Sequence, residues 1–237
     1  EGGIRRCARD GSDTHKRHLR DLAAALEDDA GSPWSWKRAA RGSPERRWCG
    51  PRSSCESSHP VQALEAFVHS RLDIGPSHLE WPEAVRSRED DAQGPHLDVH
   101  HLHAREPWGP RALTLLLFVR PLSPPGGAQA GVTDAGHAAS SAIRFTELGL
   151  DVSLRPGRLL FWANTYPNGT TDSRLRRETL SAGTASLPAD TLRLAQERGS
   201  NDAPANAQAQ QLVVNLWAHT FPFREPYHAG CWHRTST

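Results

Sequence analysis

The sequence contains no methionine and only two lysines, Lys16 and Lys37, so no lysine follows position 37. Its 28 lysine and arginine residues stand against 27 aspartate and glutamate residues, which leaves a formal net charge of +1. A chain this close to neutrality has no bulk field that would attract nucleic acid or an anionic membrane. No apolar run approaches the roughly 20 residues of a membrane span, since the longest, from Leu113 to Val119, has the length of a strand. We therefore expect no nucleic-acid partner and no membrane span in this chain.

Cysteine is scarce as well. Cys7, Cys49, Cys55 and Cys231 form no Cys-x-x-Cys pair of the kind that binds metals, and four cysteines allow three complete disulfide pairings. The lack of methionine predicts a fragment or a processed form whose targeting segment is out of view. The compartment therefore stays open, with the secretory pathway and the endoplasmic reticulum lumen among the options. Asn168-Gly169-Thr170 is a glycosylation sequon if the chain is secreted and a plain Asn-Gly turn otherwise.

The first quarter of the chain is uneven. Four residues recur at helical spacing, Leu19, Leu22, Ala23 and Leu26, and glycine, serine, proline and arginine dominate residues 31–58. We expect an N-terminal helix followed by a loop or linker over residues 1–57, poorly ordered in part, and a second domain over residues 58–237. That domain opens with apolar residues on one helical face, Val61, Leu64, Phe67, Val68 and Leu72. They predict a packed helix that ends near Gly75-Pro76.

Short apolar runs separated by turn signals follow the helix. They lie at residues 82–88, 113–119, 152–154, 158–163 and 211–221, and proline and glycine interrupt them at Pro124-Pro125-Gly126-Gly127 and Pro156-Gly157. Runs of this length predict the strands of an all-β barrel or sandwich behind a helical layer. Residues 128–142 and 181–209 are rich in small and polar residues, which predicts surface insertions or mobile loops.

One motif in this region carries chemistry. Gly94-Pro95-His96-Leu97-Asp98 places a histidine and a carboxylate two residues apart. Side chains alternate faces along a strand, so His96 and Asp98 would point the same way and could bind one metal ion. The pattern is short, and a solvated polar turn is the preferred interpretation until further motifs support a metal site.

Further motifs do support it, because the chain resembles the prolyl 4-hydroxylase branch of the iron(II)/2-oxoglutarate dioxygenases over most of residues 60–233. The matching segments, in order, are Val85-Arg86-Ser87, Gly94 to Asp98, Arg111 to Leu117, Gly126-Gly127, Arg144 to Leu150, Pro156 to Trp162, Asp172 to Leu180, and Asn215 to Phe223. Each segment is weak alone, whereas the shared order and spacing are specific.

The resemblance implies a mainly β fold, a double-stranded β-helix or jelly roll with flanking helices on one face. It also implies an iron(II) centre with His96 and Asp98 as ligands, 2-oxoglutarate as co-substrate and ascorbate as a supporting reductant. The implied activity is hydroxylation of a prolyl or similar side chain in a peptide or protein substrate. No catalytic residue is expected beyond the metal ligands.

Three family positions are substituted. The second histidine ligand corresponds to Arg177, and no histidine lies between His137 and His219 that a shifted match could use. A guanidinium stays protonated and cannot bind iron. The lysine that pairs with 2-oxoglutarate corresponds to Gln211, and a tyrosine before the metal motif corresponds to Ser87. We assign Gln211, Arg177 and Ser87 to the cofactor-binding positions, with Arg177 facing the cofactor carboxylate as one option.

Three functions follow as hypotheses. The first is an iron(II)/2-oxoglutarate dioxygenase of prolyl 4-hydroxylase type, in which another group supplies the third ligand. The second is a catalytically inactive relative that binds a peptide or an anion. The third is a hydrolytic zinc site made from His96, Asp98, His100 and His101, with His103 close in sequence. Glu178 is a poor substitute ligand, because neighbours on a strand face opposite sides.

Overall fold

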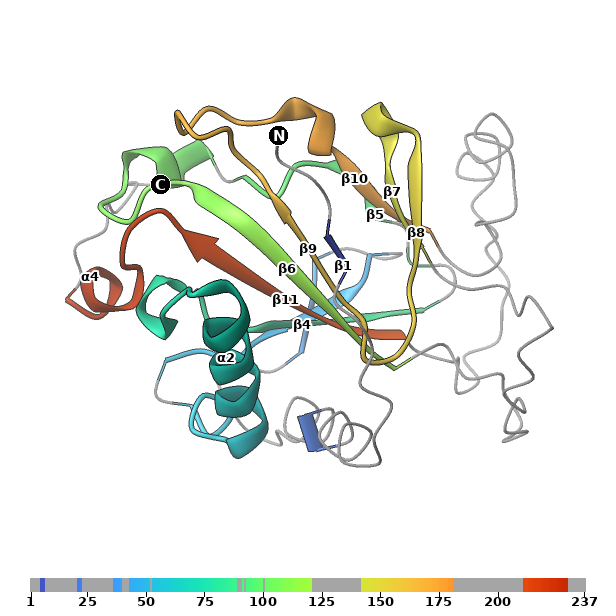
Figure 1. Ribbon diagram of the computed structural model, residues 1–237. Coiled ribbons are helices and arrows are strands. Elements are labelled where there is room, and N and C mark those ends of the chain that lie inside the picture. The colour runs from blue at the N-terminus through green and yellow to red at the C-terminus, as the bar shows by residue number, and fades with distance from the viewer. Residues whose placement is uncertain are drawn as a thin grey trace.

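Two antiparallel sheets form the molecule (Figure 1). The computed structural model describes residues 36–39, 43–51, 53–88, 93–99, 101–120, 142–180 and 211–229, with Arg5–Arg6, Asp21–Leu22 and Asp91. The larger sheet has seven strands in the order β1 (Arg5–Arg6), β9 (Leu159–Ala163), β6 (Arg111–Arg120), β11 (Gln211–His219), β4 (Glu83–Ser87), β3 (Glu45–Trp48) and β2 (Lys37–Arg38). The smaller sheet has four, in the order β5 (Gln93–His96), β10 (Arg177–Leu180), β7 (Ala142–Phe145) and β8 (Leu150–Ser153). This is the jelly roll that the motifs predict.

Helix α2 (His59–Leu72) covers one face of the larger sheet (Figure 1). Pro60 stands in its first turn, where a missing N–H costs no hydrogen bond. The helix ends where Asp73 adopts φ 56° and donates its backbone N–H to the carbonyl of His69. Val61 and Val68 are completely buried against the sheet, so the helix is held by its apolar face. The sequence prediction of a helix from Pro60 is confirmed.

The shorter helical elements lie at connections. They are the 3-10 turns η1 (Pro76–His78), η2 (His101–Arg105), η3 (Thr146–Leu148) and η4 (Ser173–Leu175), and the single-turn α4 (Arg224–His228). No helix in the described part of the chain is long and apolar enough to cross a membrane.

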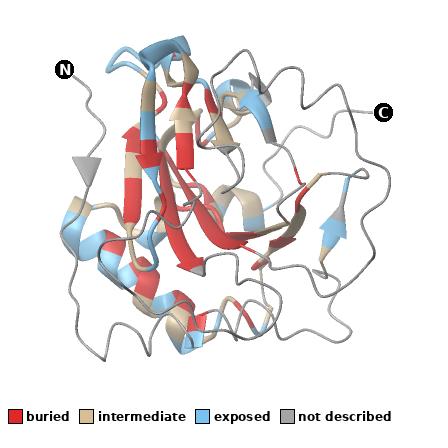
Figure 2. Cartoon of the chain, turned by 90° about the vertical axis from the view of Figure 1, so that its right-hand side faces the viewer, coloured by how far each residue is buried: buried red, intermediate tan, exposed pale blue. Residues whose placement is uncertain are grey.

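Strand β11 lies at the centre of the larger sheet, and all of its residues are buried (Figure 2). Its two faces have different neighbours because side chains alternate along a strand. Leu212, Val214, Leu216 and Ala218 pack in the cluster beneath α2. Val213 packs between the two sheets with Val85 and Phe118. Gln211, Asn215 and Trp217 share the face of Val213 by this alternation, so the polar residues of β11 face the interior of the jelly roll.

The apolar runs predicted as strands became β4, β6, β8, β9 and β11, which confirms them. The apolar runs did not predict strands β7 and β10, because the sequences of both mix charged and apolar residues; each strand overlaps a segment of the motif match. The expected insertions lie outside the described residues, apart from Ala142, which begins β7. The expected N-terminal helix also lies outside them, apart from Asp21–Leu22.

The stretch expected to be a loop or linker contributes β2 and β3 to the larger sheet. Strand β3 pairs with β4 across the expected boundary at residue 57, which remains a prediction. A disulfide joins Cys49 to Cys55 between β3 and α2, and both residues are buried. This finding selects one of the pairings that the sequence left open; Cys7 and Cys231 lie outside the described residues.

Candidate functional site: a buried Asp98–Arg177 pair

Arg177 and Asp98 form a buried ion pair between the two sheets. Arg177 begins β10 and lies directly opposite His96, the last residue of β5. Its Nε donates to Oδ2 of Asp98 and its Nη2 to Oδ1, both at 2.9 Å. The side chains are only 2% and 3% exposed, so water contributes little to the solvation of either charge. Each buried charge is therefore stabilised mainly by its partner.

Further hydrogen bonds fix the carboxylate. The hydroxyl of Thr114 on β6 donates to Oδ2 of Asp98 at 2.9 Å and accepts from the side-chain amide of Asn164 at 2.8 Å. Burial by itself would raise the pKa of Asp98, but the charge of Arg177 and the hydrogen bonds from His96 and Arg177 outweigh it. The pKa of Asp98 is therefore held well below its usual range, and the carboxylate is ionised at neutral pH.

The structure brings His96 and Asp98 together, although not on one strand as expected. Strand β5 ends at His96, and the chain then bends through Asp98. Nε2 of His96 is 3.5 Å from Oδ1 of Asp98, and Nδ1 of the same ring is 2.9 Å from the carbonyl of Gly94. The assignment of both residues as metal ligands stays a prediction.

The residues at this position do not fit an iron(II) centre. Arg177, which the resemblance assigns to the position of the third ligand, contacts both carboxylate oxygens of Asp98 and has no lone pair to offer a metal. Glu178, its neighbour on β10, lies 3.8 Å from Arg144 instead. Within the described residues, the one group of three or more His, Cys, Asp or Glu ligand atoms lies elsewhere.

Gln211 and Ser87, the substituted cofactor positions, lie opposite each other in the pairing of β11 with β4. Gln211 is 3% exposed, and its side-chain nitrogen has no hydrogen-bond partner among the described residues. An unsatisfied buried amide of this kind costs free energy unless an acceptor reaches it. Arg177, the third of these positions, is held by Asp98 and so does not present its guanidinium freely to a cofactor carboxylate.

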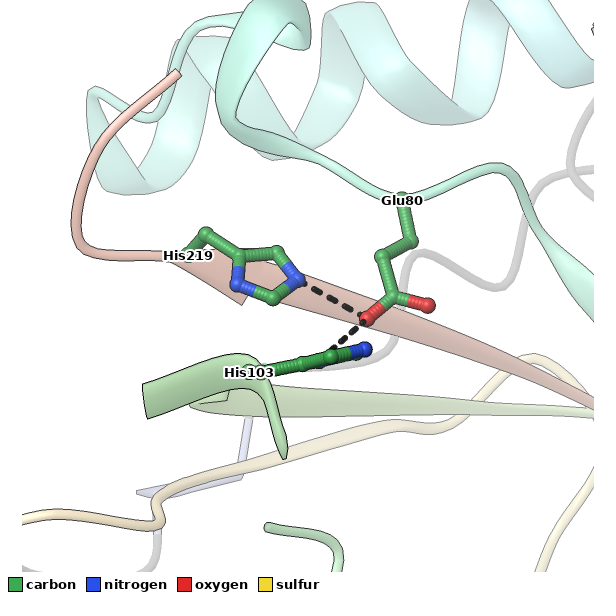
Figure 3. Close-up of side chains that lie close together, drawn as sticks. All are labelled: Glu80, His103 and His219. Carbon is green, nitrogen blue, oxygen red and sulfur yellow. Dashed lines mark hydrogen bonds and ion pairs between the residues drawn. The ribbon is translucent and has the colours of Figure 1, made fainter. Parts of the chain in front are cut away.

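A second polar cluster lies at the end of β11, where Glu80, His103 and His219 converge (Figure 3). One ligand atom from each lies within 4.8 Å of the others. Nε2 of His219 is 2.8 Å from Oε1 of Glu80, and Nδ1 of His103 is 3.9 Å from the same oxygen. Two histidines and a carboxylate are ligand types that transition metals accept, so this group is a possible metal site by geometry.

Cations already surround Glu80 in this cluster. Arg111 donates Nη2 to Oε2 of Glu80 at 2.8 Å and Nε to Oε1, and its guanidinium stacks over Trp217. Burial raises the pKa of Glu80, but the hydrogen bonds from His219 and Arg111 and their charges lower it to about 2. Nδ1 of His219 faces the carbonyl of Gly109 at 2.8 Å. Both ring nitrogens of His219 thus face oxygen atoms that can accept hydrogen bonds.

Sequence reasoning missed Glu80, Thr114 and Asn164 because each is a single polar residue in or beside an apolar run. His103 was grouped with the histidines before it, yet it joins Glu80 and His219 instead. His100 and the side chain of His101 lie outside the described residues, so the expected cluster remains a prediction. A glutamate between apolar residues, as in Leu79-Glu80-Trp81, indicates that the carboxylate is buried. A buried carboxylate in turn requires a cation nearby.

Comparisons with known proteins agree with this architecture. No protein-family model matches the chain, and no curated protein matches it either. Among solved structures, it is similar to the viral collagen prolyl hydroxylase of Paramecium Bursaria Chlorella virus-1 in complex with 2OG, with a TM-score of 0.54 at 13% identity over 91% of this chain and 95% of the other. A truncated form of that enzyme gives a TM-score of 0.52 at 12% identity over 91% and 89% of the two chains. A Pseudomonas putida prolyl-4-hydroxylase gives 0.49 at 14% identity over 92% of each chain.

The chain therefore has the jelly-roll fold of the prolyl 4-hydroxylase-like 2-oxoglutarate dioxygenases, as its motifs predict. At this level of identity the likeness concerns the fold, and function must be argued from the site.

Proposed function

We propose that this protein is an iron-free relative of the prolyl 4-hydroxylases that binds a peptide without oxidising it. The ion pair of Asp98 with Arg177 carries this proposal. A divalent cation would have to displace a guanidinium that donates two hydrogen bonds to the same carboxylate. The histidine that would hold the metal on the far side is absent from the sequence.

The polar groups inside the jelly roll support a peptide as the ligand. Of the buried side-chain atoms without a partner among the described residues, four belong to β9 and β11: the side-chain nitrogens of Gln211, Trp162 and Trp217, and the side-chain oxygen of Asn215. All four groups are uncharged. A peptide offers neutral carbonyl and amide groups that match them, whereas 2-oxoglutarate carries two negative charges that Gln211 cannot neutralise. Because one structure of similar fold is a collagen prolyl hydroxylase, a collagen-like peptide is the first candidate ligand.

The first experiment measures iron binding and succinate formation. Purified protein with iron(II), 2-oxoglutarate, ascorbate and a Gly-Pro-Pro repeat peptide should produce no succinate above the level of His96→Ala. Turnover that disappears in His96→Ala would overturn the proposal and establish the dioxygenase instead. A positive control comes from Arg177→His combined with Gln211→Lys, which restores the family's residues and should bind iron(II). Arg176→His is the matched control, since Arg176 is exposed and adjacent.

The second experiment tests the peptide. The Gly-Pro-Pro repeat peptide should bind the wild-type chain in calorimetry without added metal or 2-oxoglutarate. Gln211→Leu removes a buried donor with little change in size, and loss of one hydrogen bond of about 1 kcal/mol should weaken binding about fivefold. Equal affinity of the two proteins would show that Gln211 does not contact the peptide. Absence of binding to this peptide and to unrelated peptides would reject a peptide ligand.

A further inference from the structure

A sequon stands on an exposed turn of the chain. Asn168-Gly169-Thr170 is the only Asn-x-Ser/Thr match in the sequence, and all three residues are exposed. The turn is closed by a bridge between Thr165 and Thr171 and by a hydrogen bond from the N–H of Tyr166 to the carbonyl of Thr170 at 2.8 Å. Gly169 has φ +81°, a conformation that glycine adopts without strain. The sequon is therefore held in a defined shape on the surface.

The side chains of the sequon already contact each other. Oδ1 of Asn168 accepts hydrogen bonds from the hydroxyl of Thr170 at 2.7 Å and from its backbone N–H at 3.1 Å. The amide nitrogen of Asn168 makes no hydrogen bond to another residue of the described part of the chain. The hydroxyl thus polarises the amide through its oxygen, while the nitrogen that would be modified stays accessible.

An independent observation concerns the compartment. Cys49 and Cys55 are joined in a disulfide, and their exposures are 0% and 3%. Disulfides of this structural kind persist in oxidising compartments and are rare in the cytosol. The same compartments in eukaryotes hold the machinery that glycosylates asparagine.

We propose that Asn168 carries an N-linked glycan and that the chain folds in the secretory pathway. The donor class is a lipid-linked oligosaccharide diphosphate. Nδ2 of Asn168 forms a bond to the anomeric carbon, the bond from that carbon to the diphosphate oxygen breaks, and the lipid diphosphate leaves with the electron pair. The amide loses one proton to a base of the transferase.

The position of the turn has a consequence for the Asp98–Arg177 site. The turn extends from Asn164 and Asp172, which are joined by a backbone hydrogen bond at 2.9 Å. Asn164 also donates to Thr114, which donates to Asp98. A glycan on Asn168 would therefore be carried by a loop whose first residue, Asn164, belongs to the hydrogen-bond network of Asp98.

The test expresses the full chain behind a cleavable secretion signal in mammalian cells. Intact mass should show one N-glycan that peptide N-glycosidase removes. Asn168→Asp keeps the acceptor for both bonds from Thr170 but lacks the nitrogen, so it should show no glycan and an unchanged thermal midpoint. Thr170→Ser should retain the modification, and Thr170→Val should lose it.

Two results would overturn the proposal. One is a wild-type chain without glycan in secreted protein whose Cys49–Cys55 disulfide is confirmed by peptide mapping. The other is secreted protein in which both thiols are free to alkylation, because that removes the evidence for an oxidising compartment. Neither result depends on iron or peptide binding, so this test is separate from that of the proposed function.

Discussion

Replacing Arg177 by methionine should destabilise the protein strongly, because Asp98 would stay buried without its cation. The two hydrogen bonds at 2.9 Å are charge-assisted, and each such bond contributes about 1.5–3 kcal/mol. Removing one partner of a buried pair costs about 3–5 kcal/mol. Thr114 and His96 remain near Asp98 and stabilise its charge in part. We therefore expect a loss of about 3–4 kcal/mol in the free energy of unfolding.

The neighbouring strand supplies a matched control. Arg144 on β7 contacts Asp151 with the same two-bond geometry, both bonds at 2.8 Å. The carboxylate of Asp151 is 43% exposed, whereas that of Asp98 is 3% exposed. Exposed pairs contribute about 0.2–1 kcal/mol, so Arg144→Met should cost no more than about 1 kcal/mol. The difference between the two variants isolates the effect of burial.

Urea unfolding followed by tryptophan fluorescence measures both losses, provided that the slope with urea stays the same. Equal losses for Arg177→Met and Arg144→Met would refute the reasoning, because they would show that Asp98 gains solvent or another cation. If Arg177→Met does not fold, the double variant Asp98→Leu with Arg177→Met provides the measurement. Replacing both charges by apolar groups should restore most of the lost stability.

Two further perturbations have expected outcomes. Glu80 has a pKa of about 2 in the folded protein against 4.5 ordinarily. Its contribution of about 3 kcal/mol to the free energy of unfolding is therefore present above pH 4.5 and disappears as the pH falls toward 2. Glu80→Gln should flatten this part of the pH–stability curve, and an unchanged curve would contradict the stabilisation of Glu80 by its neighbouring cations. Replacing Cys49 and Cys55 together by alanine opens a loop of sequence separation 6 and should lower the free energy of unfolding in urea by about 2 kcal/mol. If the variant is still less stable than the wild type when both are measured under reducing conditions, the loss comes from packing and not from the disulfide.

The fold could be predicted from the sequence because its elements follow local rules. The periodicity from Val61 to Leu72 gives α2, and the run from Leu113 to Val119 gives the centre of β6. Strand β10 follows no such rule: three of the four residues of Arg177-Glu178-Thr179-Leu180 are polar, and the segment is distinguished only by its place in the order of motifs. Tertiary pairing with β5 and β7 stabilises this strand where local preference does not.

The sequence predicted the position of the candidate site but not the contacts that its residues make. Sequence placed Arg177 where a ligand should be, but the partner of an arginine is decided by contacts between residues far apart in the chain. Arg177 and Asp98 are 79 positions apart, and Glu80 and His219 are 139 apart. Such pairs leave no local pattern. The sequence does indicate that a cation is needed near such a carboxylate, since a buried carboxylate requires a cation.

Asp98 and Glu80 meet this demand in the same way, because each carboxylate contacts an arginine. Arg177 donates to Asp98, Arg111 donates to Glu80, and Nη1 of Arg111 also reaches the backbone carbonyl of Asp98 at 3.4 Å. A guanidinium supplies one positive charge and its own directed donors, so the carboxylate stays ionised without iron. In the proposed iron-free relative, the guanidinium of Arg177 would then supply the positive charge beside Asp98 that a bound metal would otherwise supply.

This equivalence predicts that Arg177→His will be unstable without metal and rescued by metal. The neutral imidazole leaves Asp98 without a cation, so the variant should unfold at lower urea than the wild type. Cobalt(II) at 100 times its dissociation constant should return about 2.7 kcal/mol by binding only the folded state. The wild type and Arg176→His should show no such response. Equal stabilisation of all three proteins by cobalt(II) would place the metal elsewhere, for instance at His103 and His219, and would break the link between Arg177 and the missing iron.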